Sequence, residues 1–119
     1  MKRMFSVLVL SAAAGAMLFA VVPSAGAKTA ATTVKVTAKD TFRFTLSRKS
    51  APHGKVTFKV VNKGNLSHDF KIAGKKTKML KHNQTATLTV TLKKGKRYTY
   101  LCTVPGHAAA GMKGIFKAT

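Results

Sequence analysis

The sequence predicts an all-β fold, namely an antiparallel Greek-key β-sandwich of about seven to eight strands. Three observations support this class. Apolar and polar residues alternate with a period of two in seven short runs, residues typical of turns separate these runs, and no segment has the longer period of an amphipathic helix. Each sheet would then have one polar face and one face in a shared core.

The expected strands follow one another along most of the chain. They cover residues 34–38, 42–46, 56–60, 70–72, 86–92, 98–102 and 115–118. The run at 86–92 is the clearest, because its apolar residues alternate with Thr87, Thr89 and Thr91. Turns rich in glycine, proline, asparagine and lysine are expected at residues 52–54, 62–65, 74–76 and 93–96. Residues 73–84 are too many for a hairpin, so we expect them to cross from one end of the sandwich to the other.

Residues 1–27 have the pattern of a secretory signal. Two basic residues precede an uncharged apolar run at 4–22, and small residues at 25–27 form a cleavage site. Cleavage would leave 92 residues (119 − 27), with a flexible leader at 28–33 and one folded domain at 34–119. The alternative is an uncleaved membrane anchor, since the apolar run is nearly long enough to span a bilayer. We expect an exported protein, in the periplasm or on the extracellular face of the cell envelope.

Cys102 is the only cysteine of the chain. A small exported domain is marginally stable on its core alone and often relies on disulfides, which a single cysteine cannot form within the chain. An odd cysteine in such a protein indicates a partner chain, a reactive thiol or a metal. A metal would also stabilise the fold, because it binds the native state.

Cys102 also opens a group of residues that can bind a metal. His107 and Met112 follow it at intervals of five residues, and His68 lies upstream. The alternation turns the side chains of His68 and Cys102 toward the core. His68 opens its expected strand and Cys102 ends another. If those two strands are antiparallel, both residues lie at the same pole of the sandwich.

Two imidazoles, one thiolate and one thioether form a ligand set that suits copper. Copper accepts thioether sulfur and cycles between Cu(I) and Cu(II), whereas methionine is a poor fourth ligand for zinc. Two histidines and a cysteine in a plane, with a long bond to an axial methionine, form the blue-copper electron-transfer site. His53 and His82 lie in polar loops outside this group, and we expect them to face solvent.

In two segments the sequence resembles the cupredoxins, the blue copper proteins that include plastocyanins, azurins and auracyanins. The first reads Asn-Leu-Ser-His-Asp-Phe around His68, and the second has the spacing Cys-x4-His-x4-Met, similar to the longer ligand loop of bacterial members. The resemblance implies that His68, Cys102 and His107 bind one copper ion with Met112 as the axial ligand. It also implies that the protein transfers single electrons and is not an enzyme.

One residue departs from the family's pattern. Many cupredoxins carry asparagine after the first histidine ligand, whereas this chain has Asp69. An ionised carboxylate cannot donate a hydrogen bond there, although the backbone N–H of Asp69 could still reach the sulfur of Cys102. A negative charge near the metal favours Cu(II), so we expect a lower reduction potential than in an asparagine variant.

The charge of the chain indicates anionic partners. Beyond the signal it keeps 20 Lys and Arg against two acids, Asp40 and Asp69, a net charge of +18 (20 − 2). We expect redox protein partners with acidic surfaces, and an anionic membrane or cell-envelope surface is the alternative. The basic hairpin at 93–97 should lie opposite the copper, with the lysines of 75–81 on the flank. Export and the absence of an aromatic-rich binding motif argue against nucleic acid.

Three functions remain open at this point. A monomeric carrier of electrons between redox partners is favoured, with Leu66 and the three alanines at 108–110 as an uncharged docking patch beside His107. The alternative is an extracytoplasmic copper protein for storage, delivery or resistance, although such proteins usually keep a more open site. The third is a copper-free binding module or a Cys–His enzyme, but nothing in the sequence supplies the residue that would orient the base of such an enzyme.

Overall fold

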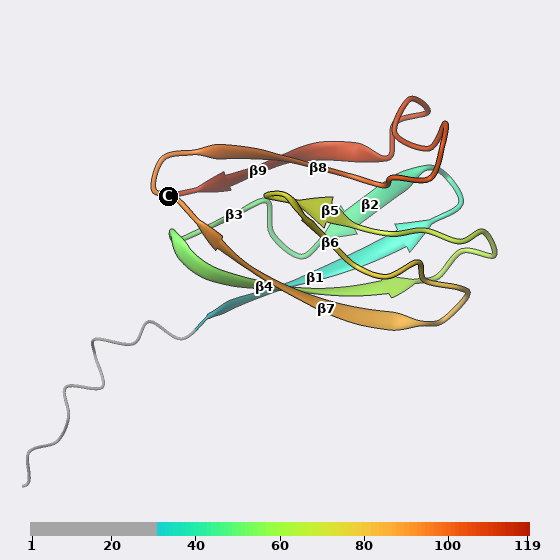
Figure 1. Cartoon of the computed structure of the whole chain (residues 1–119), viewed down its shortest axis with the longest axis horizontal. Coiled ribbons are helices and arrows are strands. Elements are labelled where there is room, and N and C mark those ends of the chain that lie inside the picture. Colours follow the sequence, from blue (N-terminus) through green and yellow to red (C-terminus); the bar gives the residue numbers. More distant parts are fainter. Residues whose placement is uncertain (1–30) are drawn as a thin grey trace, which may run out of the picture.

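The structure, a computed structural model, describes residues 31–119, which form a two-layer β-sandwich (Figure 1). The predicted signal at residues 1–27 and the leader as far as residue 30 lie outside the described residues. Within residues 31–119 every regular element is a strand, and no helix there could cross a membrane. The predicted all-β sandwich is therefore confirmed.

Nine strands make up the described part of the chain. They are β1 (Thr32–Lys39), β2 (Arg43–Leu46), β3 (Ser50–Ala51), β4 (Gly54–Asn62), β5 (Lys71–Ile72), β6 (Lys75–Lys76), β7 (Thr85–Leu92), β8 (Arg97–Leu101) and β9 (Lys113–Ala118). One sheet has the strand order β2-β1-β4-β7, and the other has the order β3-β9-β8-β5-β6. β1 begins two residues before the domain start expected at residue 34.

Alternating side chains from both sheets fill the space between the layers. In β4, Val56, Phe58 and Val60 are fully buried, and the residues between them point outward. The ring of Phe58 contacts Phe70 and Phe116 from the other layer, with ring centroids 5.3 and 5.1 Å apart. Such aromatic pairs contribute beyond the area that they bury. This cluster therefore holds the two sheets together below the pole that carries the site.

The sheets are mixed, so the prediction of a purely antiparallel sandwich is wrong in this respect. β4 lies parallel to β1, and β3 lies parallel to β9. The reason is the path of the chain, which leaves β1 through β2, passes to the other sheet at β3 and re-enters beside β1 in the same direction. The two strands that the alternation missed, β3 and β6, have two residues each, which is too short to show a period.

The expectation that residues 73–84 cross to the other end of the sandwich is also wrong. β5 and β6 form a hairpin whose two turn residues, Ala73 and Gly74, have φ of 51° and 75°. Two positive φ values match the twist of a tight hairpin, but alanine rarely adopts them, so the turn is hard to predict. The chain then returns to its starting pole, where Leu80 and His68 exchange backbone hydrogen bonds of 3.0 and 2.8 Å.

The two poles of the sandwich differ in their loops (Figure 1). The connections that follow β1, β4 and β8 meet at one pole, on the right of Figure 1. The basic turn at residues 93–96 and the C-terminus lie at the other pole, as predicted for that turn. The lysines of 75–81 begin on the edge strand β6, but the pairing of Leu80 with His68 brings the end of this segment to the pole with the loops.

Candidate metal centre

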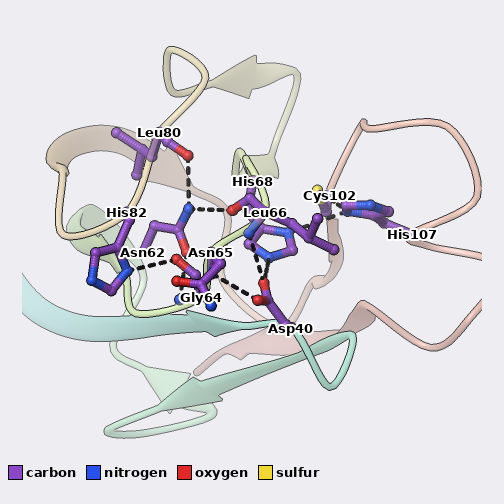
Figure 2. Close-up of polar contacts among 10 residues, drawn as sticks. All are labelled: Asp40, Asn62, Gly64, Asn65, Leu66, His68, Leu80, His82, Cys102 and His107. Atoms are coloured by element: carbon purple, nitrogen blue, oxygen red, sulfur yellow. Dashed lines mark hydrogen bonds and ion pairs between the residues drawn. The ribbon is translucent and has the colours of Figure 1, made fainter.

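Three of the predicted ligand residues converge at the loop-bearing pole. The donor atoms of His68, Cys102 and His107 all lie within 4.8 Å of one another. Nδ1 of His107 is 3.2 Å from Nδ1 of His68 and 3.6 Å from Sγ of Cys102 (Figure 2). The fourth predicted residue, Met112, is fully buried and packs in the same small cluster as Cys102. Residues that are 44 positions apart in the sequence thus share one site.

These separations fit donors that surround one ion. Bonds of about 2.0 Å to nitrogen and 2.3 Å to sulfur place two nitrogens about 3.3 Å apart and a nitrogen and a sulfur about 3.6 Å apart. The observed distances of 3.2 and 3.6 Å agree with both values. The set contains one cysteine sulfur, two imidazoles and a neighbouring thioether. This set is soft enough for copper, whereas the thioether is a poor fourth ligand for zinc.

The loop between β8 and β9 holds three of the four residues. Cys102 follows the last residue of β8, and its N–H donates to the carbonyl of Met112 at 3.1 Å, so that the pairing of the two strands closes the loop. The N–H of Met112 in turn donates to the carbonyl of His107 at 3.0 Å. Gly106 and Gly111 have φ of 84° and 116°, which residues with a Cβ rarely adopt. The backbone itself therefore sets the positions of the loop residues.

The loop that follows β4 positions His68. Its side chain is buried, as the parity of the alternation predicted, but His68 precedes β5 and forms only a single bridge, with Leu80. Buried Asn62 holds this loop, because its Nδ2 donates to the carbonyls of Leu66 and Leu80 at 2.7 Å each. Its Oδ1 accepts the N–H of Gly64 at 2.8 Å. One side chain thus satisfies three backbone groups beside the site.

Asp40 is a site residue that the sequence analysis missed. Its Oδ1 accepts a hydrogen bond from Nε2 of His68 at 2.9 Å (Figure 2). The N–H groups of Asn65 and Leu66 donate to the same carboxylate at 2.7 and 3.1 Å. The bond from His68, followed by the bond from Asn65, lowers the pKa of Asp40. The sequence offered one sign of this role. The chain has only two acidic residues, so each of them was a candidate for a specific contact in the fold.

Asp69, expected to lie near the metal, is buried beside the loop of Cys102. Its carboxylate accepts the N–H of Thr103 at 2.6 Å and also the hydroxyl of Thr103. Burial raises the pKa of the Cys102 thiol, and this effect outweighs the backbone N–H groups of Asp69 and Val104, which bond to the sulfur and lower it. A bound cation would be needed to favour the thiolate.

His107 lies at the surface end of the site and is partly exposed. Burial, and then the proximity of His68, lowers the pKa of His107, so its ring is neutral at pH 7 and can offer a nitrogen lone pair. The ring of Phe42 packs edge-on against it, with centroids 5.0 Å apart. His53 and His82 are exposed, as predicted. The ring of His53 bonds the carbonyl of Thr119, and the ring of His82 bonds the carbonyl of Gly64 in the loop that carries His68.

Comparison with known structures shows that the fold is similar to that of auracyanins and an azurin. The structure superposes on auracyanin from Roseiflexus castenholzii with a TM-score of 0.66 at 22% identity, covering 76% of this chain and 99% of that one. Auracyanin A from Chloroflexus aurantiacus, a "blue" copper protein, gives 0.63 at 18%, covering 76% and 100%. An azurin from Methylomonas sp. strain J gives 0.60 at 19%, covering 76% and 99%. At these identities the likeness shows a common fold.

Comparison of the sequence with protein families gives one match. No curated protein matches the sequence. The profile of the family described as "Cupredoxin-like domain" matches residues 10–112, from within the predicted signal to Met112. The match covers most of the 119 residues and includes all four predicted ligand residues. The chain therefore belongs to the family of cupredoxin-like domains.

Proposed function

We propose that this protein is an exported carrier of single electrons that binds one copper ion. His68, Cys102 and His107 would hold the ion, with Met112 as the fourth, axial ligand. The observation that carries the proposal is the convergence of three donor atoms within 4.8 Å, beside a buried methionine. Copper supplies a one-electron couple in such a set, and the protein catalyses no reaction of its own. The description of auracyanin A as a "blue" copper protein supports the same metal here.

The fixed geometry of the donors favours electron transfer over copper delivery. A carrier gains from donors that stay in place in both oxidation states, whereas a delivery protein needs a site that opens. Backbone bonds of 3.1 and 3.0 Å tie Cys102 to Met112 and Met112 to His107. Cys102 is 1% exposed and Met112 is fully buried, so an acceptor of copper could not reach them without opening the loop.

The exposed edge of His107 is the route by which electrons would enter and leave. Leu66, which is 47% exposed, and the exposed Ala109 and Ala110 lie in the two loops that meet there. We expect these uncharged residues to form the docking patch for the redox partner. Arg43, whose Nη1 donates to the carbonyl of Ala110 at 3.4 Å, would border this patch on one side.

The outer face of the five-stranded sheet would steer an acidic partner toward this patch. Strand register places Lys113, Leu101, Lys71 and Lys76 in one row across the sheet. The row lies next to the copper pole, because Cys102 directly follows Leu101. The lysines of this row are exposed. The positive charge is therefore not confined to the far pole, and it would raise the rate of encounter with an anionic surface.

Copper retention in both oxidation states separates a carrier from a copper-handling protein. The loaded protein would be titrated through one reduction and one reoxidation, with a Cu(I) chelator and then a Cu(II) chelator present. We expect a reversible one-electron titration with no loss of copper to either chelator. Rapid loss of one oxidation state would instead support storage, delivery or resistance. Cys102→Ser is the control, because it removes the thiolate and keeps the size of the side chain.

A further inference from the structure

Asp40 occupies a built cradle beside the proposed copper site. It lies in the turn directly after β1, and its carboxylate accepts three hydrogen bonds: Nε2 of His68 at 2.9 Å, the N–H of Asn65 at 2.7 Å and the N–H of Leu66 at 3.1 Å (Figure 2). These three donors belong to the loop that carries His68. The carboxylate thus joins the end of β1 to the loop of a predicted ligand.

The backbone of Gly64 packs closely against the carboxylate of Asp40. A Cβ on Gly64 would overlap the carboxylate of Asp40, so any other residue at that position would displace the carboxylate. Gly64 is itself held from both sides, because its N–H donates to Asn62 at 2.8 Å and its carbonyl lies 2.8 Å from Nδ1 of His82. These contacts of Gly64 hold the loop against the carboxylate of Asp40, and none of them involves the side chain of His68.

The charge distribution of the chain indicates that Asp40 has a specific role beside His68. The chain has 22 Lys and Arg and only two acids, and both acids lie at this pole. Within residues 31–119, the salt bridge that Asp40 forms is with His68, not with a lysine or arginine. Its side chain is 35% exposed, so burial alone does not exclude a lysine or arginine partner. A carboxylate serving only to offset surface charge would be expected to pair with one of them.

We propose that Asp40 is the positioning residue of His68, an inference that rests on the proposed copper-binding function. A carboxylate that accepts the Nε2–H fixes the tautomer in which the lone pair is on Nδ1. Nδ1 of His68 is the atom that faces Nδ1 of His107 at 3.2 Å. Asp40 thereby aims the lone pair of His68 at the metal position and makes the imidazole a stronger donor, which favours Cu(II) over Cu(I).

Asp40→Asn in the full chain tests this role, with Asp69→Asn as the matched control. Both variants remove one negative charge at the same pole, but only Asp40 bonds His68. Two-dimensional ¹H–¹⁵N NMR of the histidine rings before copper addition reports the tautomer of His68. We expect the Nε2–H form in the native chain and in Asp69→Asn, and a mixture of tautomers in Asp40→Asn. We also expect Asp40→Asn to weaken Cu(II) binding about 10–100-fold.

Two results would overturn the assignment. One is an Nδ1–H tautomer at His68 in the native chain, which needs no variant and so does not depend on how well Asp40→Asn folds. The other is an Asp40→Asn protein with the native tautomer and a copper affinity within twofold of the native value. Failure of the proposed function has a separate signature, because the native chain would then give no thiolate–copper absorption while the NMR result still stands.

Discussion

The carboxylate of Asp69 accepts two hydrogen bonds from Thr103, one from the backbone N–H at 2.6 Å and one from the hydroxyl. These bonds tie the residue after one predicted ligand, His68, to the residue after another, Cys102. Asp69 is buried, so its charge acts on the site with little screening by water. The pair therefore links the two ligand loops and places a negative charge beside the proposed copper.

Asp69→Asn should raise the reduction potential of the copper-loaded protein. Asparagine has the same shape, and Thr103 can rotate its hydroxyl to accept from the new amide, so the loops remain joined. Removal of one charge near the ion destabilises Cu(II) relative to Cu(I), by an amount on the order of 50–100 mV at an intermediate effective dielectric constant. Redox titration of both proteins measures the shift. An unchanged or lowered potential would show that the charge does not control the couple.

Thr103→Val separates the charge from the hydrogen bond. Valine keeps the shape of the side chain and removes only the hydroxyl that donates to Asp69. The carboxylate and its charge remain, so we expect a potential closer to the native one than to that of Asp69→Asn. Equal shifts in the two variants would assign the effect to the joined loops instead.

Asn62→Ala should destabilise the fold near the site. The variant leaves the carbonyls of Leu66 and Leu80 and the N–H of Gly64 without the partners that Asn62 provides. The carbonyl of Leu80 still accepts the N–H of His68, so two groups are left unsatisfied, at a cost of roughly 3 kcal/mol together. Urea denaturation measures the loss in the free energy of unfolding. The exposed Asn65 in the same loop supplies the control, since Asn65→Ala should change stability by less than about 0.5 kcal/mol. Similar losses in both variants would show that the three hydrogen bonds of the Asn62 side chain do not stabilise the loop.

Met112→Leu should change the copper spectrum and leave the fold intact. Leucine replaces a fully buried methionine with little change in volume, which usually costs less than about 1.5 kcal/mol. The thioether is lost, so we expect altered visible band intensities and an altered EPR spectrum of the Cu(II) protein. Identical spectra for the native and variant proteins would remove Met112 from the ligand set.

Lys71→Gln/Lys113→Gln should slow reaction with an anionic redox reagent. These lysines flank Leu101 in the row beside the copper pole. Lys55→Gln/Lys59→Gln on the exposed face of β4 removes the same charge from the other sheet and serves as the control. Stopped-flow oxidation of the Cu(I) protein by ferricyanide at low salt should slow about two- to tenfold more in the first variant. Equal slowing in both would indicate a uniform field without a steering face.

The period-two pattern could predict the pole of the site but not its full set of contacts. The parity of His68 and Cys102 follows from the strands around them, and both side chains are buried as that parity requires. The contact between Asp40 and His68 spans 28 residues, and it depends on which strands are neighbours. β1 and β4 are parallel neighbours, and alternation carries no information on strand direction. The role of Asp40 therefore became visible only in three dimensions.

The hairpin of β5 and β6 could not be predicted from the sequence for a different reason. The hairpin of β5 and β6 turns on Ala73 and Gly74, whereas hairpins with two positive φ values usually carry Asn-Gly or Asp-Gly. Here the pairing of Leu80 with His68 closes the returning segment and stabilises the turn from outside. A tertiary contact thus outweighed the local preference of alanine.

The absorption and EPR spectra of the protein after addition of one equivalent of Cu(II) test the central claim most directly. The proposed ligands predict an intense blue or green thiolate-to-copper band that is lost in Cys102→Ala. Weak absorption typical of nitrogen and oxygen ligands, unchanged in Cys102→Ala, would contradict a copper site built on the Cys102 thiolate and would leave a copper-handling or binding module as the better account.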